Sequence, residues 1–123
     1  MPEGRVDHRL VANIELAPTF AQWAGAKAPG FVDGRSLVAI LNNPEASWRT
    51  RLLFKHRLGD RNFNVLRTST DQVYIEYPFT DETEYYGLTK DPYQLHGHAE
   101  KPPPQLKGQL ADLRRCRAAD GGP

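Results

Sequence analysis

A short basic segment around His56 is the part of this sequence best suited to contact an anion. Lys55, His56 and Arg57 are consecutive, so an ammonium group, an imidazole and a guanidinium group lie side by side in the chain. Cationic side chains of these types attract anions such as phosphate and carboxylate groups. The alternative is a basic cluster on the surface of a strand with no ligand.

A second candidate is the His-x-His pair formed by His96 and His98, which could supply half of a metal site. A metal site needs further ligands in a fixed geometry, and the other histidines, His8 and His56, are remote in the sequence. We therefore expect the pair to lie exposed on a loop that contains Gly97, and we expect no metal-binding residue in the chain.

Groups suited to acid–base or nucleophilic chemistry do not form a convincing set. Asp81, Glu82 and Glu84 stand among threonines, without apolar neighbours that would raise a pKa, so we expect a solvated turn there. A small hydrolase built on His56 and Asp60 would lack a nucleophile. We therefore expect no catalytic residue in the chain.

An aromatic and basic sheet face could bind single-stranded nucleic acid. Sixteen basic and fifteen acidic residues leave a net charge of +1, which argues against a nucleic-acid or membrane partner. Tyrosines on a small sheet also commonly pack under a helix. We therefore expect neither a nucleic-acid nor a membrane partner. The residues considered for a nucleic-acid surface are Arg67, Tyr74, Tyr77, Tyr85 and Tyr86.

The composition is that of a single globular domain. Of 123 residues, 39% are hydrophobic and 25% are charged. No stretch is long enough to span a membrane, and the first residues lead into no apolar run of signal-peptide length, so we expect a cytoplasmic protein. Cys116 is the single cysteine, which excludes an intrachain disulfide, and we expect an exposed, inert thiol.

Local patterns predict helical segments before residue 50. Between Arg9 and Gly25, apolar residues recur at three- and four-residue spacing, with Pro18 suited to a first helical turn and Gly25 to a C-terminal stop. The part before Pro18 could instead form a separate turn. A second short helix is predicted from Ser36, as its cap, to Leu41.

The middle of the chain predicts β-structure and its end predicts a helix. After a run of prolines, a stripe of Leu106, Leu110 and Leu113 indicates an amphipathic helix. Alternating apolar residues and turn signals before it predict strands at Arg51–Arg57, Phe63–Thr68, Val73–Tyr77 and Tyr85–Leu88.

These elements predict an α+β fold. We expect residues 51–123 to form a small antiparallel sheet of three to four strands with the C-terminal helix packed on it. Residues 1–50 are expected to form a helical segment, and the two parts to pack as one compact unit.

Several segments, in order, resemble the end of a sulfatase of the arylsulfatase and N-acetylglucosamine-6-sulfatase type. The run from Leu10 to Phe20 is similar to one that leads into a helix of the large domain in that family. Asp33–Leu37 resembles its Asp-Gly-x-Ser-Leu segment, and Glu84–Leu95 its Glu-Leu-Tyr-Asp-Leu-x-x-Asp-Pro closing motif. The resemblance covers about Val6 to Cys116. Lys55 and Gly87 depart from it, because Glu and Asp are usual at these positions.

The resemblance implies that the chemistry of the family lies outside this segment. Sulfatases use a formylglycine, made from Cys or Ser in a Cys/Ser-x-Pro-x-Arg motif, and a calcium ion. This sequence has no such motif, so we expect no cofactor. The interpretation is a truncated, non-catalytic fragment acting as a structural or binding module. The alternative is a subunit that completes a sulfuric-ester hydrolase with a separate catalytic chain.

The resemblance also implies that the N-terminal helical segment packs on a sheet of the large domain. Without that sheet, its apolar residues would lose their partner, and exposed apolar patches tend to be buried by association. We therefore expect a homo-oligomer, or refolding of this segment onto the chain's own sheet. The residues concerned are Phe20, Trp23, Leu37, Ile40 and Leu41.

Overall fold

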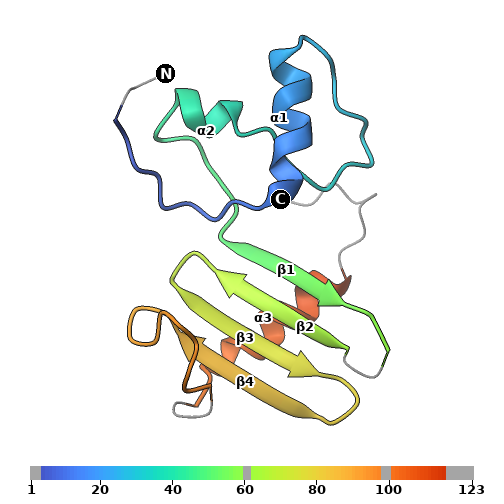
Figure 1. Ribbon diagram of the computed structural model, residues 1–123, viewed down its shortest axis with the longest axis vertical. Helices are drawn as coiled ribbons and strands as arrows, with labels where there is room; N and C mark the ends of the chain where they lie inside the picture. The colour runs from blue at the N-terminus through green and yellow to red at the C-terminus, as the bar shows by residue number, and fades with distance from the viewer. Residues whose placement is uncertain (1–3, 60–61, 98–100, 116–123) are drawn as a thin grey trace. The chain divides into compact units, whose positions relative to one another are not determined.

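The computed structural model describes residues 4–59, 62–97 and 101–115, which fall into two compact units. The N-terminal unit lies within residues 4–49, and the sheet unit runs from residue 50 to residue 115 (Figure 1). Among the described residues, every helix is too short or too polar to cross a bilayer. The expectation that these two units pack together as one compact body stays a prediction.

The N-terminal unit contains the 3₁₀ turn η1 (Asn13–Glu15) and the helices α1 (Leu16–Trp23) and α2 (Val38–Asn42). Residues before η1 are extended, so the helix begins later than Arg9 and a separate turn precedes Pro18. Pro18 lies in the first turn of α1, where its missing N–H costs no hydrogen bond. The helix stops before Gly25, whose φ of 74° favours glycine.

Thr19 connects α1 to the segment that leads into α2. Its hydroxyl donates to the Glu15 carbonyl (2.6 Å) and accepts from the Leu37 amide (2.9 Å). In the same segment, the Ser36 hydroxyl accepts from the Val38 amide (3.3 Å), so the predicted cap lies beside a helix that begins two residues later. Short side chains therefore set the path of the chain between the two helices.

A buried ion pair holds the end of this unit to its beginning. Glu15 is fully buried and accepts a hydrogen bond from the Ala12 amide. Arg49 Nη2 lies 2.9 Å from Glu15 Oε1 and forms an ion pair with it. The two groups are not aligned for a hydrogen bond. The Trp48 indole beside it donates to the Leu10 carbonyl (2.6 Å). Residues 48 and 49 are thereby anchored where the N-terminal unit ends.

The apolar residues of this unit have different environments. Ile40 was predicted to lose its partner, but it is buried (3% exposed), and Arg5 and Arg9 donate to its carbonyl. The prediction for Ile40 was therefore wrong. Phe20 and Trp23, in contrast, are 57% and 58% exposed. The uncovered apolar surface of this unit thus includes α1, together with Val6, Val11, Ile14 and Phe31 outside it.

The sheet unit contains one antiparallel sheet in the order β1-β2-β3-β4, followed by the helix α3 (Gln105–Arg115). Each strand pairs with the next along the chain, and the prediction of an α+β fold with a packed C-terminal helix is confirmed. The strands are β1 (Arg51–His56), β2 (Phe63–Thr68), β3 (Gln72–Tyr77) and β4 (Glu82–Gly87).

The core of this unit lies between α3 and one face of the sheet (Figure 1). The register places Leu53, Leu66, Tyr74 and Tyr85 in one row across the four strands. The predicted leucine stripe of α3 packs on this row, with Leu106 and Leu110 buried and Leu113 partly buried.

The last strand differs from its prediction. β4 begins at Glu82, three residues before the predicted Tyr85, so Glu82 and Glu84 belong to a strand and not to a solvated turn. The following segment returns to this edge strand, where Gly97 O accepts a hydrogen bond from the Tyr85 amide (3.0 Å). Such cover limits the number of unpaired backbone groups at a sheet edge.

Candidate binding surface

The sheet face opposite α3 carries the side chains that alternate with those of the core. Among the described residues of the sheet unit, no helix or strand crosses this face (Figure 1), although the loop residue Gly97 lies against the Tyr86 ring. Leu52 and Val73 are buried, whereas Phe54 is nearly half exposed. We call this surface the open face, and it consists of Leu52, Phe54, His56, Phe63, Val65, Arg67, Val73, Ile75, Tyr77, Glu82, Glu84 and Tyr86.

Aromatic rings line one end of the open face. The His56 imidazole stacks on the Phe63 ring, with centroids 4.8 Å apart and 14° between the planes. Phe63 in turn meets Tyr77 at 6.0 Å with a tilt of 60°. Three adjacent strands therefore present a continuous row of rings, and such rings supply large apolar contact area.

Glu84 joins two tyrosines beside this row. The Tyr77 hydroxyl donates to Glu84 Oε1 (3.0 Å), and the Tyr86 hydroxyl donates to Glu84 Oε2 (2.6 Å). Burial and the carboxylate raise the pKa of Tyr77, while the hydrogen bond to Glu84 and burial raise the pKa of Tyr86 to about 12. The expectation of a solvated turn at Glu84 was therefore wrong. The alternation of Glu82, Glu84 and Tyr86 was the signal that could have revealed this cluster.

Glu84→Gln is expected to lower the pKa of Tyr86 toward the ordinary tyrosine value of about 10, because the charged acceptor is lost. In the native protein, the raised pKa means that this hydrogen bond stabilises the fold fully below about pH 10. That contribution is lost as the pH rises through about 12. Spectrophotometric titration of tyrosine ionisation, with Tyr86→Phe to assign the transition, measures the shift. Glu82→Gln is the matched control, and an equal shift in that variant would contradict the assignment.

The three residues of the predicted anion contact do not point to one side of the sheet. His56 lies on the open face, whereas Lys55 pairs with Asn64 in the register and lies on the α3 side. Arg57 Nη2 donates to Asn64 Oδ1 (2.8 Å), so its guanidinium is held at that buried amide. An anion contact at these residues stays a prediction. Of the three, only His56 lies on the open face.

The other residues considered for chemistry are dispersed. His96 is exposed, and its backbone amide donates to Asp91 Oδ2 (2.9 Å), while His98, Asp60 and Cys116 lie outside the described residues. Among the described residues, no three His, Cys, Asp or Glu side chains gather as a metal site would require.

The aromatic and basic residues considered for nucleic acid are also divided. Tyr74 and Tyr85 lie in the core under α3, whereas Tyr77 and Tyr86 lie on the open face. Arg67, on the same face, forms an ion pair with Asp71 (3.1 Å).

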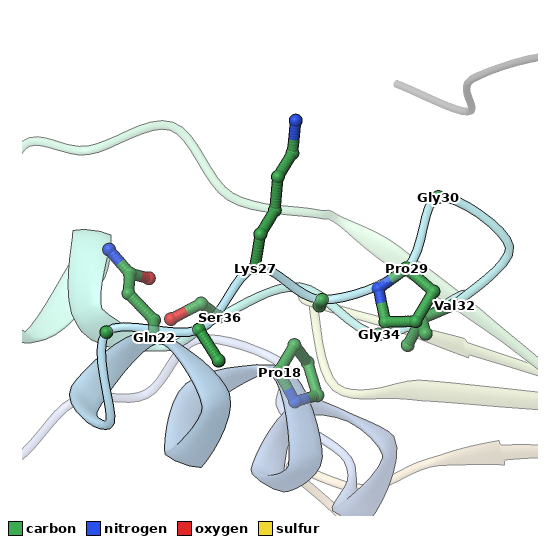
Figure 2. A pocket seen from close by; sticks show the side chains of 11 residues that line it. Pro18, Gln22, Lys27, Pro29, Gly30, Val32, Gly34 and Ser36 are labelled. Atoms are coloured by element: carbon green, nitrogen blue, oxygen red, sulfur yellow. The ribbon is translucent and has the colours of Figure 1, made fainter.

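A hollow of about 460 Å³ lies in the N-terminal unit, between α1 and the loop that follows it. Figure 2 shows the Lys27 side chain extending away from Pro18 and Pro29, which line the hollow. The residues with polar side chains among those that line it are Gln22, Lys27 and Ser36. Binding sites for small molecules combine an apolar cavity with convergent polar groups, and this open hollow does not show that arrangement.

Comparison with known proteins identifies the family. The family described as N-sulphoglucosamine sulphohydrolase, C-terminal, matches residues 1–115. This chain belongs to that family. The resemblance of its motifs to the end of a sulfatase is therefore confirmed.

Two relatives with similar sequences are much longer than this chain. An arylsulfatase of Clostridium perfringens is 25% identical over 93 residues, which are 76% of this chain and 19% of that protein. An N-acetylglucosamine-6-O-sulfatase of Bacteroides thetaiotaomicron is 27% identical over 101 residues, which are 76% of this chain and 18% of that protein.

Solved structures show the same relation. BT4656, solved in complex with its substrate D-glucosamine-2-N,6-O-disulfate, has a TM-score of 0.66 and 27% identity. The match covers 89% of this chain and 24% of BT4656. This chain thus spans about a quarter or less of the length of these relatives.

Proposed function

We propose that this chain is a non-catalytic module that binds, through its open face, the catalytic part of a sulfatase. That part could belong to the same longer polypeptide or to a separate chain. The observation that carries the proposal is the sheet itself, whose one side is covered by α3, whereas no helix or strand of the described sheet unit lies on its opposite side (Figure 1). A sheet with apolar side chains on both faces is stable when both faces are covered.

The chemistry of the open face supports a protein partner. Phe54, Val65 and Ile75 form an apolar centre across three strands, and large apolar patches of this kind mark sites of association. The aromatic row supplies ring surface at one end, and Glu84 supplies a partly exposed carboxylate. A partner with apolar side chains and an Arg or Lys near Glu84 would match this pattern.

The non-catalytic role rests on the sequence. Sulfuric-ester hydrolysis of this family needs a nucleophile, a metal and an acid that converge on one atom. The sequence contains no Cys/Ser-x-Pro-x-Arg motif from which the family makes its nucleophile. We therefore assign formylglycine and calcium to the partner.

Ile75→Glu is expected to weaken binding of the catalytic part about 30-fold or more, because a charge would be buried at the centre of the contact. The measurement is the affinity of this chain for the sulfatase catalytic segment encoded directly upstream of it. Gln105→Glu, on the exposed side of α3, adds the same charge and is expected to bind normally. If Ile75→Glu binds as well as Gln105→Glu, the proposal is wrong.

A second candidate is that the module also completes the active site. The position of His56 favours it, because this side chain is half-buried at the end of β1 on the open face and is held by Phe63. In that case His56→Ala lowers kcat of the assembled protein by about 100-fold or more. Lys55→Ala, on the other side of the sheet, is the control. An unchanged kcat in the His56→Ala complex would mean that the module binds the catalytic part but does not complete its active site.

A further inference from the structure

The loop that leads into α2 contains an aspartate followed by a glycine, Asp33 and Gly34. Asp33 is exposed. Among the described residues, neither its carboxylate nor the Gly34 amide has a hydrogen-bond partner. The carboxylate and the amide nitrogen are neighbours in the chain, and no other contact has to break before they react with each other.

Asp71 shows by contrast how the fold protects an aspartate. Its carboxylate forms an ion pair with Arg67 (3.1 Å), and the amide that follows it, of Gln72, donates to the Thr68 hydroxyl (3.2 Å). Both of the groups that would react are held at Asp71, and both are free at Asp33.

We propose that Asp33 forms isoaspartate in the folded protein, through attack of the Gly34 nitrogen on Asp33 Cγ. Glycine favours this attack because it has no Cβ to hinder the approach. The N–H proton and the carboxyl hydroxyl leave together as water, and the new N–C bond closes a succinimide ring. Water then opens the ring at either carbonyl. One opening returns aspartate, and the other gives isoaspartate, whose main chain runs through the former side chain.

The change would affect a tightly packed part of the N-terminal unit. Isoaspartate lengthens the main chain by one methylene group immediately before Gly34. A Cβ at Gly34 would lie 1.9 Å from the Ile14 carbonyl oxygen, so the loop has no room to shift toward η1. Further along the loop, the Leu37 amide donates to the Thr19 hydroxyl of α1 (2.9 Å). Isoaspartate at residue 33 is therefore expected to weaken the connection between this loop and α1, independently of the open face in the sheet unit.

Incubation of the full chain in water labelled with heavy oxygen tests the proposal, because opening of the ring incorporates the label. Peptide mapping by electron-transfer mass spectrometry then distinguishes isoaspartate from aspartate at each position. We expect labelled isoaspartate at Asp33 and none at Asp71. Asp33→Glu keeps the charge and is expected to lose the product, because glutamate must close a larger ring. Asp120, outside the described residues, also precedes a glycine, and the mapping assigns its product separately.

The same incubation in urea separates the chemistry of the sequence from the effect of the fold. A folded chain without isoaspartate at Asp33 would overturn the proposal, and formation in urea alone would assign the protection to the packing of Gly34 on Ile14. Equal formation at Asp33 and Asp71 in the folded chain would also contradict it. The isomerised chain, separated by ion-exchange chromatography, is expected to unfold at a lower urea concentration than the unmodified chain. An unchanged midpoint would refute the effect on the loop.

Discussion

Arg49→Ala is expected to destabilise the protein by about 3–5 kcal/mol, because it leaves a buried carboxylate without its partner. The Glu15 side chain is 0% exposed and that of Arg49 is 13% exposed, so water cannot replace the lost guanidinium easily. Glu15 also accepts the Ala12 amide at the start of η1. Loss of the Glu15–Arg49 ion pair therefore affects both the turn that leads into α1 and the position of residue 49.

Urea denaturation of Arg49→Ala measures this cost, with Lys27→Ala as the matched control. Lys27 is an exposed cation in the same unit, and its removal is expected to change stability by less than about 0.5 kcal/mol. Because the pair lacks an aligned hydrogen bond, replacing both partners by Glu15→Leu and Arg49→Met should recover much of the loss. An Arg49→Ala variant as stable as Lys27→Ala would show that the pair contributes nothing.

Gly34→Ala is expected to cost about 3 kcal/mol or more, at the upper end of overpacking effects. A Cβ at Gly34 would lie 1.9 Å from the Ile14 carbonyl oxygen and 2.6 Å from its carbon. Both are backbone atoms of the turn that leads into α1, so they cannot rotate away as a side chain does. The loop that contains Gly34 must therefore move as a whole, and the Leu37 hydrogen bond to Thr19 with it.

Gly30→Ala is the control for this substitution, because it changes the same loop at a position with no heavy atom within 4 Å of the added Cβ. This substitution is expected to be neutral or slightly stabilising, since alanine lowers the conformational entropy of the unfolded chain. Chemical denaturation of the two variants side by side gives the difference. Equal stability of Gly34→Ala and Gly30→Ala would mean that the close approach to Ile14 is not a constraint on the fold.

Local patterns were sufficient to predict most of the secondary structure. The leucine stripe of α3 was predictable because a helical period depends on residues three and four apart. Pro18 and Gly25 likewise mark the ends of α1 by their own backbone preferences. The early start of β4 was missed, because charged and polar residues at its beginning lack strand propensity and depend on pairing with β3.

The candidate surface was only partly predictable. Lys55, His56 and Arg57 are neighbours in the sequence, yet the pleat places Lys55 and His56 on opposite sides of the sheet. His56 was singled out for its chemistry, but its contact with Phe63 depends on the register of β1 and β2. The role of Glu84 was missed, because its two tyrosine partners come from β3 and from its own strand.

The sequence by itself determined the α+β class, the order of the elements and the resemblance to the end of a sulfatase. Each of these depends on residues close together in the chain or on motifs in a fixed order. Only the tertiary structure decided which side chains are covered. It paired Glu15 with Arg49, buried Ile40, and left Phe20, Trp23 and Phe54 exposed. The physical reason is that burial and pairing depend on which distant segments pack together, and local periodicity does not specify that choice.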